Sequence, residues 1–301
     1  MTMQKAENDA AAHIGAFSLS LCVCARDRVD TLRRCLDSVA GADVLPQEVV
    51  VSDDSRDPAP TEALCRAYPF VRYVRGPQRG LCANRNQAVR ASSGRYLSFL
   101  DDDGLMARDF VSVAALLVSD ETARVIFTGD LLEAEQQWRL PPTNPNFWGH
   151  YGAAIKKEYL TIHINSNLLP RAVFASISFD ENLLYGYDEM DICAQALAAG
   201  YRIEYRPALA NRHVPPLKDK AARAQEQSQA EGARFYTSVK RLWVLQRRPL
   251  RAIAYIVLAP LHRTAFDVKM KNWKDIPRAF GDMARALRLL RGWRMQGALS
   301  L

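Results

Sequence analysis

The sequence predicts an α/β fold in which helices cover both faces of a mostly parallel central sheet, followed by a C-terminal helical basic extension. Strand-like and helix-like runs alternate through roughly the first hundred residues, which is the order typical of a parallel sheet. Two strand-like runs stop at consecutive carboxylates, Asp53-Asp54 and Asp101-Asp102-Asp103. Residues 233–301 carry a net charge of +12, which leaves −5 for the rest of the 301-residue chain. An acidic body with a basic tail indicates a partner for the tail.

The alternation begins with a Val/Leu/Cys-rich strand at Phe17–Cys24, followed by a helix capped by Asp30 or Thr31. The apolar residues of this helix recur at i, i+3, i+4 and i+7, which predicts one buried face made by Leu32, Cys35, Leu36 and Val39. The next elements are expected to be a strand at Glu48–Ser52, a helix at Thr61–Ala67, a strand at Val71–Arg75, a helix at Gly80–Ala91 and the strand that ends at Asp101.

Further along, the patterns are less regular but still alternate. Leu140–Gly152 is rich in Pro, Asn and aromatic residues, and we expect a loop over the sheet edge there. The other expected elements are a helix at Asp109–Val118, strands at Arg124–Thr128, Ile162–Leu169 and Tyr201–Tyr205, a helix from Asp188 to Ala199, and a helical connector at Lys218–Glu231.

Composition limits the class of protein. The apolar fraction of 49% is ample for a core, and the six cysteines contain no Cys-x-x-Cys pair. We expect reduced core cysteines in a reducing compartment. The polar N-terminus shows no apolar secretory segment.

The stretch from Gly94 to Gly104 is the most informative. A short apolar run, typical of a buried strand, stops at three successive carboxylates, which repel one another. The carboxyl ends of strands are where open α/β sheets bind ligands, and Asp101 with Asp103 can face one hard cation whose other ligands are waters and a phosphate. A solvated acidic turn is the alternative. Asp53-Asp54 has two interpretations as well, a contact to a base or ribose and an Asx-turn.

Three other groups of residues have both a possible chemical role and a purely structural interpretation. Arg85 can pair with the strand-end acids or a diphosphate, or lie exposed on its helix. In Asp188-Glu189-x-Asp191 a carboxylate can take a proton from an attacking hydroxyl, or the acids can cap the helix and complement its dipole. His213 can join two carboxylates around Mn²⁺ or a similar ion, or be a structural histidine.

Five segments in this order resemble the family 2 glycosyltransferases, which have the Rossmann-like GT-A fold, and the resemblance covers about residues 17–215. They are Cys22-Val23-Cys24-Ala25-Arg26-Asp27-Arg28, Val51-Ser52-Asp53-Asp54-Ser55, Arg79-Gly80-Leu81 with Arg85-Asn86, Phe99-Leu100-Asp101-Asp102-Asp103, and Tyr185-Gly186-Tyr187-Asp188-Glu189-Met190-Asp191.

The resemblance implies an inverting transfer from a nucleotide-sugar, usually a UDP-sugar, with Mg²⁺ or Mn²⁺. By position it implies that Asp53 and Asp54 lie at the nucleoside end of the donor and that Arg85 lies beside the nucleotide pocket. It implies metal and ribose binding by the Asp101 and Asp103 pair. His213 falls where some members place a further metal ligand.

The resemblance also places the catalytic base. The Asp188-Glu189 pair matches the family's Glu-Asp pair with the two acids exchanged, so the base is Glu189 by position or Asp188 by residue type. Arg26, in the first segment, is assigned to donor binding. It stands in an Ala25-Arg26-Asp27 sequence where many members have Thr-Tyr-Asn.

These assignments divide the chain. We expect a disordered tail at 1–16, a nucleotide-sugar-binding half at 17–104, an acceptor-binding half at 105–232 and an amphipathic helical extension at 233–301.

The extension is expected to lie on a membrane surface. The apolar run Ala252–Leu261 is too short to span a bilayer. Further on, one helical stripe is apolar while arginines lie mostly off it, which is typical of an interfacial helix on anionic lipid. The stripe consists of Phe280, Met283, Ala284, Leu287 and Leu290. Packing of these helices on the acidic body is the alternative, and no recognition motif for nucleic acid is present.

The sequence therefore predicts a hexosyl- or N-acetylhexosaminyl-transferase that builds surface polysaccharide on a glycan or lipid-linked acceptor, in the cytoplasm and peripheral on the inner face of the cell membrane. Two other classes stay open: a nucleotide-sugar-binding protein of the same fold without catalysis, and a basic membrane-surface binding protein. The exchanged acids favour the first of these, and the second leaves the Asp triplet unexplained.

Overall fold

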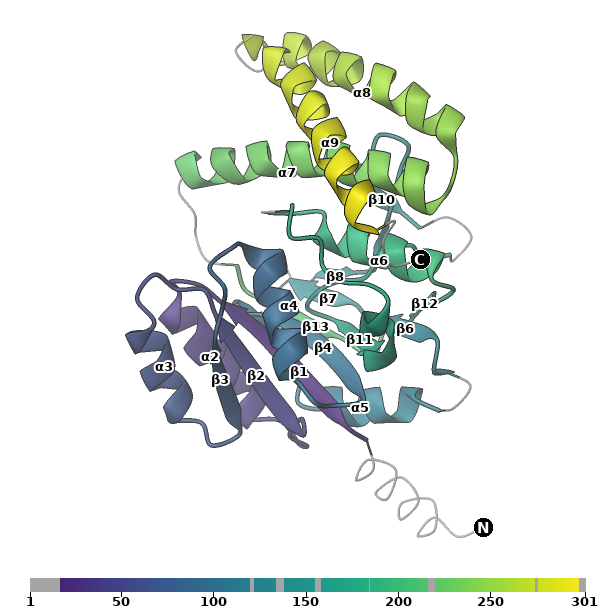
Figure 1. Ribbon diagram of the computed structural model, residues 1–301. Helices are drawn as coiled ribbons and strands as arrows, with labels where there is room; N and C mark the ends of the chain where they lie inside the picture. The colour runs from purple at the N-terminus through teal and green to yellow at the C-terminus, as the bar shows by residue number, and fades with distance from the viewer. Residues whose placement is uncertain are drawn as a thin grey trace.

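A computed structural model describes residues 17–119, 122–133, 138–154, 158–183, 185–215, 220–273 and 276–297. The expected tail at 1–16 lies outside these residues. In Figure 1 the sheet and its helices form the lower body, and three long C-terminal helices lie above it.

A seven-stranded sheet is the centre of the body. β1 pairs in parallel with β2 and β4, β2 with β3, and β6 with β12, while β11 runs antiparallel between β4 and β6. Across the sheet the strands are β12 (Arg202–Tyr205), β6 (Val125–Thr128), β11 (Asn167–Pro170), β4 (Tyr96–Asp101), β1 (Leu19–Ala25), β2 (Glu48–Asp53) and β3 (Val71–Arg75). The mostly parallel sheet predicted from the sequence is confirmed.

Helices cover both faces of this sheet because side chains alternate along each strand. Leu21 and Val23 of β1 pack in a core with α2, α3 and α5, whereas Cys22 and Cys24 pack in a second core with α4 and α6. The helices are α2 (Val29–Ala40), α3 (Ala59–Arg66), α4 (Leu81–Ala91), α5 (Phe110–Leu117) and α6 (Asp188–Ala198). All six cysteines are buried and unpaired, as predicted.

A second, four-stranded sheet lies at the edge where the acids gather, and a short antiparallel pair stands beside it. The smaller sheet has the order β5 (Gly104–Leu105), β13 (Asn211–His213), β7 (Leu131–Glu133) and β8 (Trp138–Leu140). The separate pair is β9 (Thr143–Pro145) and β10 (Tyr151–Ala153).

Three expectations for local structure are wrong. The segment 140–152 is not a plain loop, because backbone pairing of β9 with β10 makes it a short hairpin. The strand expected at 162–169 is only β11, since the amide of Ser166 turns back to donate to the carbonyl of His163 at 3.0 Å. Neither Asp30 nor Thr31 caps α2, because Thr31 lies inside the helix and its hydroxyl donates to the Arg28 carbonyl at 3.0 Å.

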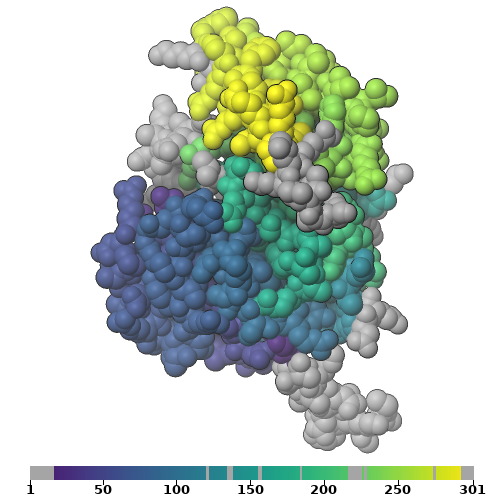
Figure 2. Space-filling model, in the orientation of Figure 1, coloured from purple at the N-terminus to yellow at the C-terminus, as the bar shows by residue number. Residues whose placement is uncertain are grey.

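Three helices form the C-terminal extension: α7 (Lys220–Lys240), α8 (Pro249–Lys269) and α9 (Ile276–Gly297), with a π-helical turn, η3 (Arg241–Leu245), after α7. They make a distinct lobe on the body (Figure 2). α7 runs past the predicted end of the helical connector at 231 because Phe235, Tyr236 and Val239 continue its buried face. The division of the chain at residues 104 and 232 stays a prediction.

Only part of the apolar stripe expected to face lipid on α9 is used for packing, since Ala284 is exposed. Met283 and Leu290 are buried in the core that contains α7 and α8, and Leu287 is partly buried against it, while Phe280 is exposed. None of the helices described is both long enough and apolar enough to cross a membrane.

Candidate active site

The two acidic strand ends lie at the same edge of the sheet. Ala25 at the end of β1 pairs with Asp53 of β2, and the preceding Cys24 pairs with Asp101 of β4. Parallel pairing therefore brings acids about fifty residues apart to one rim.

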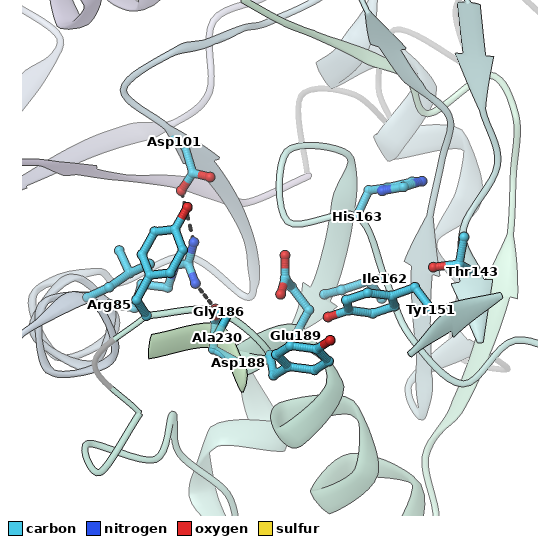
Figure 3. Close-up of a pocket in the computed structure, with 13 residues that line it drawn as sticks. Arg85, Asp101, Thr143, Tyr151, Ile162, His163, Gly186, Asp188, Glu189 and Ala230 are labelled. Carbon is cyan, nitrogen blue, oxygen red and sulfur yellow. Dashed lines mark hydrogen bonds and ion pairs between the residues drawn. The ribbon is translucent and has the colours of Figure 1, made fainter. Parts of the chain in front are cut away.

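A pocket of about 480 Å³ opens at this rim beside the start of α6. Asp101 and Arg85 form one side of it, Tyr151 and His163 the other, and Glu189 stands between them (Figure 3). The structure thus brings together four of the predicted site residues, since Asp188 also lines the pocket.

Arg85 is the link between the strand end and α6. Its guanidinium donates to Asp101 Oδ1 at 2.9 Å and forms an ion pair with Asp188, and its side chain is 2% exposed. Burial alone would lower the pKa of Arg85, but the charges of Asp101 and Glu189 hold it above the ordinary value. Arg85 is not the exposed helical arginine of the structural alternative.

Glu189 presents its carboxylate to the pocket, whereas the Asp188 carboxylate is held by Arg85 (Figure 3). Asp188 is the first residue of α6, not its cap: the capping position is Tyr187, in a left-handed conformation with φ 62°. That conformation, with Gly186 at φ 75° before it, turns the chain sharply into the helix. Of the two acids, Glu189 is the one oriented toward a bound molecule.

Tyr151 of β10 reaches across to Glu189. Its ring stacks on Tyr187 with centroids 5.3 Å apart, and its hydroxyl lies inside the pocket facing the Glu189 carboxylate (Figure 3). Although Tyr151 is 42% exposed as a residue, burial around its hydroxyl and the charge of Glu189 raise the pKa of Tyr151 well above 10. The hydroxyl is therefore a hydrogen-bond donor to the carboxylate.

The other two acids of the triplet are held by Arg28. Its guanidinium lies 2.5 Å from Asp102 Oδ1 and 3.0 Å from Asp103 Oδ2. Asp102 is fully buried, and burial raises its pKa to about 7 in spite of the Arg28 charge. Burial would also raise the pKa of Asp103, but hydrogen bonds from His213 and Arg28 hold it below the ordinary value. Arg28 and Arg85 together explain how three neighbouring acids are tolerated.

His213 lies between two carboxylates. Its Nε2 is 3.5 Å from Asp103 Oδ1 and its Nδ1 is 3.2 Å from Glu133 Oε1. Burial alone would lower the pKa of His213, but the two carboxylates raise it to about 9. The pairing arises because β13 lies between β5 and β7 in the smaller sheet.

Asp103 and His213 have the chemistry of a divalent-metal site. A carboxylate oxygen and an imidazole nitrogen face each other, and the second imidazole nitrogen is fixed by a carboxylate, as is usual for metal-bound histidine. Asp101 is engaged by Arg85 instead. Among the residues that the structure describes, no three His, Cys, Asp or Glu side chains gather as a complete ligand set. The residues present fit an ion that takes its remaining ligands from a phosphate and water.

The Asp53-Asp54 pair lies at the rim but does not line the pocket. Asp53 is fully buried and accepts from the Ser55 amide at 2.9 Å, which is the Asx-turn alternative, and from the Tyr73 hydroxyl at 3.0 Å. Asp54 accepts from the Gln78 amide at 2.8 Å. Arg26 is exposed, at 3.9 Å from Asp27. Donor binding by these three residues stays a prediction.

Sequence reasoning missed Arg28, Glu133 and Tyr151. Arg28 is the last residue of the first of the five segments but received no role there, although its charge next to a strand end was a usable signal. Glu133 and Tyr151 lie on short strands of three residues, where no periodicity marks them.

The family model described as Glycosyl transferase family 2 matches residues 20–174 of the chain. Among curated proteins, the hyaluronan synthase of Pasteurella multocida is 27% identical over 122 residues, which are 39% of this chain and 13% of that protein. The minor teichoic acid biosynthesis protein GgaB of Bacillus subtilis is 26% identical over 150 residues, 47% of this chain and 16% of that protein. The chain thus spans a small part of the length of these relatives.

Solved structures resemble most of the chain. The S. aureus TarS fragment 1-349 in complex with UDP superposes with a TM-score of 0.60 at 16% identity, covering 90% of this chain and 81% of that one. The mannosyltransferase PcManGT from Pyrobaculum calidifontis, in complex with GDP-Man and Mn²⁺, gives a TM-score of 0.53 at 16% identity, covering 94% and 92%. At this identity the likeness shows a shared fold.

Proposed function

The chain belongs to glycosyl transferase family 2 and has the GT-A fold, and from this premise we propose that it is an inverting enzyme that moves a hexosyl or N-acetylhexosaminyl group from a nucleotide-sugar to a hydroxyl of a glycan or lipid-linked acceptor. The observation that carries the proposal is the pocket in which Arg85 joins Asp101 to Asp188 while Glu189 stays open to a ligand. The product is proposed to be a surface polysaccharide.

The donor is proposed to be a nucleoside diphosphate sugar, most simply a UDP-sugar. TarS with UDP-GlcNAc and PcManGT with GDP-Man are similar in fold, which supports this class of donor. Asp53, Asp54 and Arg26 would bind the nucleoside end, with Asp101 and Arg85 nearer the sugar. The backbone amide of Ser55 donates to Asp53 and that of Gln78 donates to Asp54, so both carboxylates are already oriented.

Mn²⁺ or Mg²⁺ would be held by Asp103 and His213, with Asp101 at the edge of the site. When bound, the ion neutralises the charge that develops on the departing diphosphate. Arg28 keeps the Asp103 carboxylate ionised and oriented, and Glu133 fixes the imidazole through Nδ1. The Mn²⁺ in the PcManGT complex supports this choice of ion.

Glu189 is proposed as the general base and Asp188 as the partner that orients Arg85. A carboxylate open to the pocket can take the proton of an acceptor hydroxyl as that oxygen attacks the anomeric carbon. The attack comes from the face opposite the leaving diphosphate, so a single displacement inverts the anomeric configuration. Tyr151 holds the Glu189 carboxylate in place during this step.

The extension at 233–301 is proposed to bring the enzyme to an anionic membrane surface, on the inner face of the cell membrane. Its net charge of +12 supports this, since each Lys or Arg near such a surface contributes about 1 kcal/mol. A lipid-linked acceptor would be met there.

The test is a panel of nucleotide-sugars assayed for hydrolysis and transfer with Mn²⁺, with the product anomer read by NMR. Asp103→Ala is expected to lower turnover about 100-fold or more, because several kcal/mol of charge stabilisation depends on the ion. Asp30→Ala, at an exposed acid of α2, is the control and is expected to be neutral. A folded Asp103→Ala variant with normal turnover contradicts the metal assignment, and a retained anomer contradicts inversion.

A further inference from the structure

Exposed apolar side chains are concentrated in one part of the molecule. Of the fifteen large apolar side chains that stand exposed in the described residues, ten lie between 250 and 280. Four of them recur at i, i+3, i+7 and i+11, which places them on one side of α8; we call this stripe the α8 outer face. It consists of Leu250 (80% exposed), Ile253 (48%), Val257 (56%) and Leu261 (51%).

The α8 outer face belongs to a helix that is firmly packed on its other side. Ala252, Tyr255 and Ala259 are each no more than 1% exposed and lie in the core shared with α7 and α9. Beside the outer face, an apolar groove of about 380 Å³ runs between α8 and α9, with Val257 on one wall and Phe280 on the other. The exposed surface is therefore presented by a fixed helix, not by a frayed one.

The charges around this face are nearly all positive. Between residues 247 and 271 there are six Lys and Arg residues and a single carboxylate, Asp267. The six basic residues are Arg247, Arg248, Arg251, Arg263, Lys269 and Lys271. Asp267 is fully buried and receives a hydrogen bond from Arg263 at 2.8 Å. Because basic residues flank both ends of α8, a two-fold contact between two copies through this face would bring like charges together.

We propose that the α8 outer face and the adjoining groove dock on an anionic lipid bilayer. The apolar side chains enter the acyl boundary and the flanking cations meet the head groups, as in an interfacial helix. This deepens the proposed recruitment of residues 233–301 and rests on it, but it assigns the main contact to α8, and the α9 stripe contributes only as the second wall of the groove. In Figure 1, α8 lies on the far side of the molecule from the sheet. The residues that line the pocket include Ala230 of α7 and none of α8, so the docked face and the pocket are separate.

The experiment is flotation of the full chain with phosphatidylcholine vesicles and with vesicles that also contain phosphatidylglycerol. The double variant Leu250→Ser/Val257→Ser removes apolar surface without disturbing the core. Its matched control is Leu45→Ser/Leu116→Ser, two exposed leucines of the body at 44% and 66%. Wild type and control are expected to float with the anionic vesicles, and the α8 variant to lose about tenfold or more of the bound fraction.

Three results would overturn the assignment: equal loss in the control, unchanged flotation of the α8 variant, or equal binding to both kinds of vesicle. A concentration-dependent dimer in solution that the α8 variant abolishes would assign the face to a second copy instead. Donor hydrolysis without vesicles is measured on every variant and is expected to be unchanged. If hydrolysis is absent from wild type as well, the proposed enzymatic function fails independently of the membrane result.

Discussion

Glu189 and Asp188 are adjacent in the sequence but differ in environment, and this difference predicts different roles. Glu189→Gln is expected to lower kcat by about 10²–10⁴-fold, the range for loss of a general base. Asp188→Asn keeps a hydrogen-bond acceptor for Arg85 and is expected to cost less activity. Steady-state kinetics of both variants measures the two losses, and circular dichroism checks that each variant is folded. A larger loss in Asp188→Asn would exchange the roles.

Tyr151 permits a finer test at the same site. Tyr151→Phe keeps the stack on Tyr187 and removes only the hydroxyl that faces Glu189, so kcat is expected to fall about tenfold, since a hydrogen bond to a charged group contributes about 1.5–3 kcal/mol. The KM for the donor should stay unchanged. Tyr151→Ala removes the stack too and is expected to be slower still. If wild type and Tyr151→Phe have the same kcat, the hydroxyl has no role in the reaction and Tyr151 contributes only packing.

These residues also show where sequence reasoning succeeds. Asp101 and Asp188 were predictable because each stands where a strong local pattern, a strand or a helix, begins or ends. Pairing of Arg85 with a strand-end acid was one of several options, and its pairing with Asp188 was not among them, because these partners lie 16 and 103 residues away. Tyr151 carried no local signal, since its position depends on the pairing of two strands of three residues.

At the scale of elements, a buried ion cluster fixes α7 against α6. Lys240 Nζ lies 2.6 Å from Asp180 Oδ2 and 2.9 Å from Asp191 Oδ1, and all three side chains are at most 3% exposed. Asp191, which the sequence placed among first-turn acids, therefore acts as an anchor for the extension. No sequence pattern predicts this, because Lys240 is 49 and 60 residues from its partners.

Lys240→Met is expected to be strongly destabilising. The substitution leaves the carboxylates of Asp180 and Asp191 buried without their cation. Removing one partner of a buried ion pair lowers the free energy of unfolding by about 3–5 kcal/mol. Urea unfolding at neutral pH measures the change in the free energy of unfolding. Lys269→Met, at an exposed lysine at the end of α8, provides the comparison and is expected to be close to neutral. Equal stability of the two variants would mean that the cluster contributes nothing net.

Glu231 joins α7 to α8 and gives a pH-dependent contribution. Burial would raise the pKa of Glu231, but Arg234 at 2.7 Å and Arg263 at 3.0 Å hold it below the ordinary value of 4.5. A carboxyl whose pKa is lower in the folded state stabilises the fold above its unfolded pKa, and the contribution is lost as the pH falls through the folded pKa. Glu231→Gln is expected to reduce the free energy of unfolding by about 1–3 kcal/mol at pH near 7.

The same comparison at lower pH tests the sign. As the pH falls below about 4.5, the difference between wild type and Glu231→Gln is expected to shrink, because protonation removes the charge that the variant lacks. A difference that grows on acidification would contradict the assignment.

Over the whole molecule, the extension and the body share one apolar core. A single cluster of buried residues runs from Cys22 and Phe99 in the sheet to Met283 and Leu290 in α9. The composition predicted ample core material but not this continuity, because the basic charge of the tail indicated an outside partner whereas its apolar stripe packs inward. In the structure the apolar side chains of the extension are divided between this core and the exposed α8 outer face.

A shared core implies one cooperative unfolding unit. Met283→Ala, at a side chain that is 4% exposed, is expected to lower the free energy of unfolding of the entire chain by about 2–5 kcal/mol, the range for truncating a buried methionine. Phe280→Ala on the same helix, at a side chain that is 49% exposed, should have a much smaller effect. Far-ultraviolet circular dichroism and tryptophan fluorescence, followed through one urea titration, are expected to give coincident transitions for wild type and both variants. Two separate transitions, with only the first moved by Met283→Ala, would show that the extension folds and unfolds apart from the sheet, and the anchoring by Lys240 and Glu231 would then be local to the helices.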